Sequence, residues 1–394
     1  MLIQKNSERL GSVDALRGFA LLAIVLLHNL EHYNIFGAPH ASSSILQWLD
    51  RFSYDSIFFL LAGKAYATFS LLFGFSFFIQ LRNARARGCD FRARFAWRMF
   101  LLFCFSQFHA LFYNGDILLL YSVCGLILIP AASWKDRTVL IVATVLMLQP
   151  YAWAKVLYGL AHPDYVDANN AFAQFAIKAE QTGRNGNLLQ MLADNIWNGQ
   201  LYSNFWQVEA GRLFQTPALF LYGMWLGRKQ MFVKSVESTM FWRRTLIIAF
   251  IAAIPLYFLC REVPGHIESV TVLAYYCIAV PMVYNFSFMC VLVSLFMLVW
   301  FRSADGLKWQ RVIMPYGRMS LTNYIFQSIL GVIIYYHFGF GMYDKIGNFG
   351  SVLVGIGIFA VQWLFSKWWL GGHKQGPLEY LWKKGTWINF QKCV

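Results

Sequence analysis

Long hydrophobic runs separated by short polar segments dominate the sequence. An α-helix needs about 20 mostly apolar residues to cross the hydrocarbon core of a bilayer. About ten runs are long enough, and each predicts a membrane-spanning helix. They lie near residues 15–32, 55–81, 95–113, 116–134, 138–158, 207–227, 244–261, 272–300, 319–338 and 348–367. The pattern predicts an all-α, polytopic membrane helix bundle.

A long segment between the fifth and sixth runs is more polar than the rest. Within it, Ala171–Ala179 and Leu188–Trp197 have apolar residues at helical spacing. This predicts short amphipathic helices that lie on the membrane surface or cap a cavity. We expect one membrane domain over residues 1–394, with a five-helix half at 1–158, an external segment at 159–206 and a five-helix half with a tail at 207–394.

Composition supports the membrane interpretation. Hydrophobic residues make up 58% of the 394 residues and charged residues only 13%, about half the share typical of soluble domains. These values exclude a soluble enzyme, a disordered chain and a secreted disulfide scaffold. The seven cysteines and the histidines show no metal-ligand spacing, so we expect neither a metal site nor a disulfide framework.

The net charge of +14 is explained by membrane topology rather than by nucleic-acid binding. If the N-terminus is cytoplasmic, 25 of the 33 Lys and Arg residues fall on one side of the membrane. Basic residues accumulate in cytoplasmic loops, so the chain is predicted to have both termini in the cytoplasm. Seven of the eight histidines then lie at or beyond the outer ends of helices.

His109 and Asp116 flank a short polar turn between two apolar runs. A carboxylate beside a histidine orients its ring and stabilises the imidazolium, which suits a general base. The alternative is structural, with Asp116 capping a helix and His109 at the interface.

Lys64 lies inside an apolar run, where a charge costs at least about 2.5–3.5 kcal/mol unless it meets water or a partner. It predicts an anion-binding or proton-coupled residue in a cavity. The alternative is a lysine whose side chain extends to the outer interface.

A second histidine group follows the first run. His28 and His32 lie one helical turn apart, next to Asn29 and upstream of His40. The group could supply a catalytic base, bind a metal or simply occupy the interface. We favour no metal, because the spacing matches no tight ligand motif.

Three further sets of polar residues are candidates for binding. Asp14 and Arg17 at the inner start of the first run set the topology or contact the phosphates of a donor. Glu209 and Arg212 at the outer start of the sixth run are spaced to pair. The last set lies within an apolar run and serves either helix–helix hydrogen bonding or substrate contact: Thr322, Asn323, Gln327 and Ser328.

Five motifs carry a family resemblance. Ser12–Gly18 resembles the opening of membrane acyltransferases, including the YeiB-type family and the lysosomal heparan-glucosaminide N-acetyltransferase group. The other four resemble the YeiB-type family and follow in the expected order: Gly63-Lys64 with Phe69–Gly74, His109–Tyr121, Gly317–Tyr324 with Gln327, and Gly376–Trp382.

The resemblance implies a multi-helix membrane bundle in the bacterial inner membrane, grouped with transmembrane acyltransferases. In the acetyltransferase group an asparagine ends the first span and a histidine follows. Here His28 stands at the asparagine position with Asn29 next, and His40 falls near the histidine. The positions of Lys64, His109 and Asp116 match the YeiB-type pattern itself.

The function that follows from the resemblance is acyl transfer from a cytoplasmic acyl-CoA to a hydroxyl or amine of an envelope glycan, lipid or small molecule. His109, His40 or His28 would be the base, Asp116 would orient it, and Lys64 would stabilise an oxyanion. The expected donor contacts are Asp14, Arg17 and Arg318, and the expected substrate contacts are Asn29, Tyr121, Arg212, Asn323, Tyr324 and Gln327.

No permanently bound cofactor is expected; acyl-CoA would be a co-substrate. The expected partners are membrane lipids and the substrate, with no nucleic acid, and a homodimer is left open. A rival interpretation is a transporter, although the sequence shows no obvious pair of broken helices in an inverted repeat. A third is a structural bundle without activity of its own.

Overall fold

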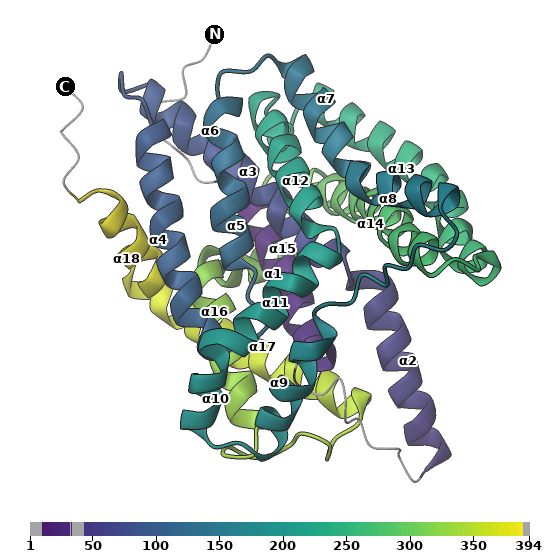
Figure 1. The fold of residues 1–394 in the computed structure, drawn as a ribbon. Helices are drawn as coiled ribbons and strands as arrows, with labels where there is room; N and C mark the ends of the chain where they lie inside the picture. The colour runs from purple at the N-terminus through teal and green to yellow at the C-terminus, as the bar shows by residue number, and fades with distance from the viewer. Residues whose placement is uncertain (1–9, 32, 34–42, 389–394) are drawn as a thin grey trace.

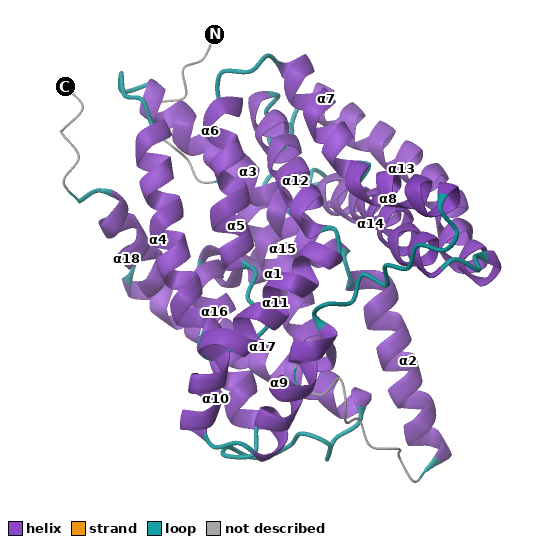
Figure 2. Ribbon diagram, viewed as in Figure 1, coloured by secondary structure: helices purple, strands orange, loops and turns teal. Residues whose placement is uncertain are grey.

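The computed structural model describes residues 10–31, 33 and 43–388, and in these ranges the chain forms helices and no strands (Figures 1 and 2). The predicted all-α fold class is confirmed. The N-terminal half contains α1 (Gly11–Glu31), α2 (Ser44–Leu61), α3 (Lys64–Arg85), α4 (Arg92–Ala110), α5 (Leu118–Cys124), α6 (Leu128–Ala131), α7 (Asp136–Met147) and α8 (Pro150–Ala161).

The remaining helices cover the central segment and the C-terminal half. They are α9 (Ala173–Asn185), α10 (Leu188–Asp194), α11 (Gln200–Glu209), α12 (Arg212–Arg228), α13 (Val236–Glu262), α14 (Val270–Trp300), α15 (Lys308–Arg318), α16 (Ser320–Tyr335), α17 (Asn348–Gly372) and α18 (Pro377–Thr386). Each predicted apolar run overlaps one or more of these helices, and α9 and α10 occupy the two stretches predicted to be amphipathic.

Fewer helices than the predicted ten are long enough to cross a bilayer unaided. Within the described residues, five have the length and hydropathy for a crossing: α1, α2 with α3, α13, α14 and α17. The bent pair of α7 and α8 would make a sixth. Several other runs form shorter helices, including α16 with 16 residues. The bundle therefore combines complete crossings with shorter apolar helices.

Two of the predicted single spans are interrupted. Helices α2 and α3 meet at Ala62 and Gly63, where Gly63 has a φ of 74° and an added Cβ would lie 2.5 Å from the Asn285 side chain. Helices α7 and α8 meet at an angle of 43°, and Gln149 at their junction has a φ of 55°. Both interruptions lie within hydrophobic runs that the sequence pattern predicted as single spans.

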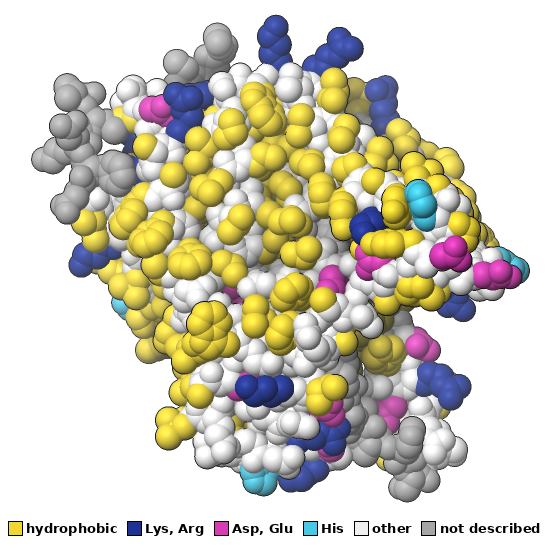
Figure 3. All heavy atoms as spheres, viewed as in Figure 1, with side chains coloured by type: hydrophobic (Ala, Val, Ile, Leu, Met, Phe, Trp, Pro, Cys, Tyr) yellow, Lys and Arg dark blue, Asp and Glu magenta, His cyan; other side chains and the backbone are white. Residues whose placement is uncertain are grey.

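The outer surface is that of a membrane protein. Helix α1 is mostly buried, whereas α13 and α17 expose apolar side chains such as Ile248, 67% exposed, and Trp368, 71% exposed. Figure 3 shows a broad hydrophobic band with few charges, and Lys and Arg side chains gather above and below it. Lipid is the solvent that accommodates such a surface.

Small residues allow the central helices to approach closely. An added Cβ on Gly317 of α15 would lie 1.9 Å from the backbone oxygen of Asp14 in α1, and one on Gly18 would lie 2.5 Å from the backbone oxygen of Ile313. Gly223 of α12 packs in the same way against the backbone of α3 at Leu71. Backbone contact of this kind drives helix association in membranes.

The loop before α7 and the end of α12, both predicted to be cytoplasmic, meet at one end of the bundle. This end is here called the basic end. Arg228 bonds the backbone oxygen of Trp134 at 2.8 Å and the Asp136 carboxylate at 3.0 Å. In the tail, the rings of Trp382 and Trp387 lie 3.4 and 3.8 Å from the Arg98 and Arg94 guanidinium carbons, respectively.

Helix α18 of the tail also caps α16. The Glu379 carboxylate accepts hydrogen bonds from the backbone amides of Leu321, at 2.7 Å, and Thr322, at 3.1 Å. These amides belong to the first turn of α16, which lacks intrahelical acceptors. One further feature departs from expectation: Cys89 is disulfide-bonded.

Helices α9 to α11 cover the opposite end of the bundle, with α9 and α10 at the bottom of Figure 1. The Asn195 side chain donates to the backbone oxygen of Leu111 at 3.0 Å. The side chains of Gln207 and Ser203 donate to the backbone oxygen of Asp116 at 2.7 and 3.2 Å. These bonds hold the turn between α4 and α5.

Candidate functional site

His109 lies between two buried polar partners. Its Nδ1 atom is 2.7 Å from Oδ1 of Asp116, and its Nε2 atom is 2.8 Å from Oγ of Ser328. The three residues come from the end of α4, the turn before α5 and the middle of α16. His109 and Ser328 are 0% exposed and Asp116 is 3% exposed. The pair predicted from the sequence therefore forms, and it gains a third member.

The Asp116 carboxylate also accepts two backbone hydrogen bonds. Oδ1 accepts from the amide of Leu118 at 3.2 Å, and Oδ2 accepts from the amide of Leu119 at 3.1 Å. The N-terminal amides of a helix favour a negative charge. Asp116 thus caps α5 and binds His109, so the two interpretations offered by the sequence both hold for Asp116. His109 itself is completely buried within the protein.

Aromatic rings enclose the histidine. The Tyr324 ring lies 4.9 Å from the His109 ring and the Tyr113 ring 5.4 Å. The Tyr324 hydroxyl accepts from the backbone amide of Ile117 at 3.3 Å. The His28 ring lies 5.0 Å from Tyr113 and 6.1 Å from Tyr324. His28 therefore belongs to the shell of the site.

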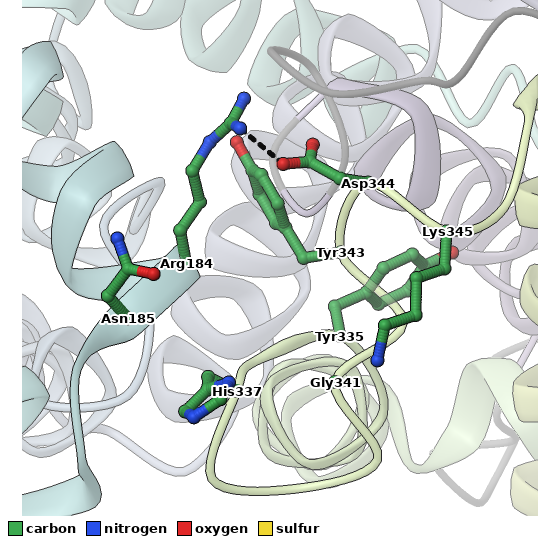
Figure 4. A pocket seen from close by; sticks show the side chains of 8 residues that line it. All are labelled: Arg184, Asn185, Tyr335, His337, Gly341, Tyr343, Asp344 and Lys345. Carbon is green, nitrogen blue, oxygen red and sulfur yellow. Dashed lines mark ion pairs between the residues drawn. The ribbon is translucent and has the colours of Figure 1, made fainter.

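A row of tyrosines leads away from His109 toward a pocket. The Tyr33 ring lies 5.6 Å from Tyr113 and stacks on Tyr335 at 5.5 Å. Tyr335 lines a pocket of about 250 Å³ between the end of α9 and the loop that follows α16. Figure 4 shows Arg184 and Asp344 paired at its wall, with His337 and Lys345 across from them.

Comparisons with known proteins show which proteins the chain is similar to. Residues 226–389 match the family described as Protein of unknown function (DUF418). The chain is 27% identical to the "Uncharacterized protein YeiB" of Escherichia coli (strain K12), over 96% of each chain. The resemblance to the YeiB-type family is confirmed.

Two further relatives come from Bacillus. The "Uncharacterized protein YxaH" of Bacillus subtilis (strain 168) is 27% identical over 98% of this chain and 96% of its own. The "Uncharacterized 39.9 kDa protein in amylase 3'region" of Bacillus acidopullulyticus is 24% identical over 96% and 94%. No solved structure matches the chain.

Lys64, in another YeiB-type motif, lies apart from His109. It is 4% exposed at the start of α3, and its Nζ atom lies 5.2 Å from the Tyr284 ring and 5.4 Å from the Phe288 ring of α14. Within the described part of the chain it has no ion-pair partner. The contacts of His109 and Asp116 lie on α5, α11 and α16, so these observations separate Lys64 from the pair.

Tyr121 and Arg212 both contact Tyr66 of α3, which is a third location for the predicted site residues. The Tyr121 hydroxyl is 2.6 Å from Oγ of Ser70 and 3.3 Å from the backbone oxygen of Tyr66. The Arg212 guanidinium carbon lies 4.5 Å from the Tyr66 ring and 4.1 Å from the Trp206 ring. Glu209 was expected to pair with Arg212, but its carboxylate accepts a hydrogen bond from the backbone amide of Phe172.

The remaining polar residues of α16 differ in what they contact. Asn323 donates to the backbone oxygen of Tyr316 at 3.0 Å and to Ser366 at 2.9 Å, so it joins α15, α16 and α17. Gln327 Nε2 lies 3.3 Å from Nδ1 of His28. Gln327 Oε1 and Asn29 Oδ1 are buried and have no hydrogen-bond partner among the described residues.

The predicted donor contacts lie on α1 and α15, which pack against each other at Asp14 and Gly317. Arg17 bonds Asp14 at 3.2 Å and the hydroxyl of Ser76. Arg318 is half-buried and donates to the backbone oxygen of Lys374 at 3.0 Å. His32 and His40 lie outside the described residues. The described residues contain no cluster of His, Cys, Asp and Glu able to hold a metal ion.

Sequence reasoning missed the contribution of Ser203, Gln207, Tyr33 and Tyr113. Their only signal was position: two polar residues near the end of the external segment and two tyrosines close to predicted helix ends. Ser328 was considered only as a helix-packing residue. It is 219 positions from His109, and no local pattern links the two.

Proposed function

We propose that this chain is a membrane acyltransferase whose general base is His109. The observation that carries the proposal is the position of His109 between Asp116 and Ser328, at 2.7 and 2.8 Å. A base must have one ring nitrogen free to take a proton and the other held in place. Asp116 does the holding here, and it is therefore a positioning residue.

Orphaned acceptors near the site support an acceptor with hydroxyl or amine groups. Gln327 Oε1 and Asn29 Oδ1 are buried without partners among the described residues. Buried polar atoms normally have partners. A hydroxyl or amine of an envelope glycan, lipid or small molecule would supply the donors. This keeps Asn29 and Gln327 as proposed substrate contacts.

The proposed donor is an acyl-CoA that approaches the basic end. Its phosphates would meet Arg17 and Arg318, because phosphate pairs well with the fork of a guanidinium. Asp14 would position Arg17, to which it is bonded at 3.2 Å. Lys64 takes no part in this reaction, because its contacts lie on α14.

The experiment uses purified protein in lipid nanodiscs with [14C]acetyl-CoA and a bacterial envelope extract as acceptor. Wild-type protein should transfer label, and His109→Gln should lower the rate at least about 100-fold. His162→Gln is the matched control, because His162 is exposed and bonds only a backbone oxygen of its own helix. Unchanged transfer by His109→Gln would refute the role of His109, and absence of transfer by wild type would refute the function.

A transporter of small anions is the second candidate, and Lys64 favours it. The ammonium is buried at the interruption between α2 and α3, without an ion-pair partner among the described residues. In membrane transporters the N-terminus of an interrupted helix receives anionic substrate groups. The test is uptake of 14C-labelled short carboxylates by sealed proteoliposomes without an acyl donor. Transport predicts uptake that Lys64→Gln abolishes, whereas the acyltransferase predicts none.

A further inference from the structure

Ser328 is the least explained member of the site. Its hydroxyl is completely buried in the middle of α16 and lies 2.8 Å from Nε2 of His109. The alternative partner, the backbone oxygen of Tyr324, is 3.5 Å away. The shorter contact is to the histidine, so the hydroxyl points at the base rather than at its own helix.

The hydrogen-bond pattern fixes which atom is the acceptor. The Asp116 carboxylate accepts from two backbone amides, one at each oxygen, and an acceptor-only carboxylate fits this pattern. It therefore also accepts from Nδ1–H of His109, which leaves Nε2 with a lone pair. That lone pair faces the Ser328 hydroxyl. This is the order of groups that activates a serine nucleophile, and such sets are defined by geometry rather than by sequence order.

The place of Ser328 along α16 suits a reaction between two sides of a membrane. The Glu379 carboxylate of α18 binds the first turn of α16, and Tyr335, the last residue of α16, lines the pocket. With a rise of 1.5 Å per residue, Ser328 lies about 12 Å from the start of α16 and about 10 Å from Tyr335. A donor from one end and an acceptor from the other need a group between them that can carry the acyl chain.

We propose that Ser328 is the nucleophile and carries the acyl group as an ester, an inference that rests on the proposed acyl transfer. The Ser328 oxygen attacks the thioester carbonyl while His109 Nε2 takes the hydroxyl proton. The carbon–sulfur bond breaks, and the thiolate leaves with that proton. The acceptor hydroxyl or amine then attacks the ester, passing its proton to His109, and Ser328 leaves and regains the proton.

Tyr33 is placed to stabilise the oxyanion of both steps. Its hydroxyl is buried near Ser328 and has no hydrogen-bond partner of standard geometry among the described residues. The ring fits there because residue 331 is glycine: an added Cβ would lie 2.4 Å from the Tyr33 ring. A preorganised donor in a dry site stabilises developing charge strongly.

The first test needs no knowledge of the donor. A fluorophosphonate probe reacts with activated serines, and mass spectrometry locates the adduct. Wild-type protein should be labelled at Ser328, Ser328→Ala should not be labelled, and His109→Gln should react at least about 100-fold more slowly. Ser294→Ala is the matched control, because Ser294 is also a fully buried helical serine, on α14. Absence of an adduct at Ser328 in wild type would overturn the proposal.

The second test separates this inference from the proposed function. Protein mixed with [14C]acetyl-CoA alone should retain label after denaturation, and Ser328→Cys should retain it as a thioester that neutral hydroxylamine releases. If Ser328→Ala transfers acetyl groups at the wild-type rate, the ester is wrong and direct transfer by His109 stands. If the fluorophosphonate labels Ser328 but no acetyl group is transferred or retained, the serine is activated and the acyltransferase assignment fails.

Discussion

At the scale of single residues, the site depends on which hydrogen bonds each carboxylate oxygen of Asp116 accepts. One oxygen contacts His109 and an amide of α5, and the other contacts the next amide. The backbone oxygen of the same residue is held by Gln207. The ring of His109 is thus fixed by a residue that is itself held by two other elements.

Asp116→Asn should lower transfer by about 10²–10⁴-fold while leaving the protein folded, because an amide can donate to Nδ1 and favour the wrong tautomer. Rates of acetyl transfer in nanodiscs measure the loss. A structural role alone would predict that Asn, which also caps helices, preserves the rate. The affinity for acetyl-CoA should change little.

Tyr33→Phe should keep the ring and remove only the hydroxyl. We expect a loss of about 10²–10³-fold in transfer, the usual effect of deleting one oxyanion donor. Tyr335→Phe is the control, since Tyr335 has the same stacked position but its hydroxyl faces Ser351. Equal effects of the two substitutions would remove Tyr33 from the mechanism.

The sequence predicted part of this site for physical reasons that can be named. His109 and Asp116 are seven positions apart across one turn, so local spacing was sufficient. The partner Ser328 is distant in sequence, and any buried helical serine is more simply explained by packing. Lys64 was grouped with His109 because both positions match the YeiB-type pattern; only the packing of α3 on α14 separates them.

At the scale of elements, glycines set the distances between helices. Gly317 brings α15 onto the backbone of α1 at Asp14, and Gly331 gives Tyr33 its place beside α16. The sequence predicted the helices from their hydrophobic runs, but an apolar run does not reveal an interruption. The break at Gly63 requires a left-handed φ. Glycine in a membrane helix also serves close helix packing, so its presence alone does not predict a break.

Gly317→Ala should destabilise the bundle by about 1–3 kcal/mol, because the new Cβ would lie 1.9 Å from a backbone oxygen that cannot move alone. Thermal unfolding in detergent measures the effect. Gly357→Ala in α17 is the matched control, since an added Cβ there meets nothing within 4 Å. Equal melting temperatures for the two variants would contradict the close crossing.

The loop between α8 and α9 is fastened by Asp167, whose carboxylate binds Lys155 at 2.9 Å and Tyr275 at 2.8 Å. Burial alone would raise the pKa of Asp167, but these hydrogen bonds outweigh it and hold the pKa below its ordinary value of 3.8. Its stabilising contribution is therefore present above that value and is lost as the pH falls through the folded-state pKa.

Thermal unfolding of wild type between pH 6 and about pH 3 should thus show a loss of stability on acidification. Asp167→Asn should start from a lower melting temperature at pH 6 and lose less of it. Parallel pH profiles for the two proteins would show that the carboxylate contributes no pH-dependent stability.

At the scale of the whole molecule, the bundle places its polar groups inside and its apolar groups outside. Composition alone predicted this inversion, because a chain that is 58% hydrophobic and 13% charged cannot cover a soluble surface. What it could not predict is a row of polar residues along α16 between a basic end and a pocket. That row would give the proposed acyl transfer a route through the protein.

The central claim is that Asp116 holds His109 with its Nε2 lone pair facing Ser328. Solid-state NMR of protein labelled with [15N]histidine, with the His109 signal assigned by its loss in His109→Gln, reports which ring nitrogen carries the proton. We predict a neutral ring protonated at Nδ1 near neutral pH, changing in Asp116→Asn. A ring protonated at Nε2 in the wild-type protein would contradict the account.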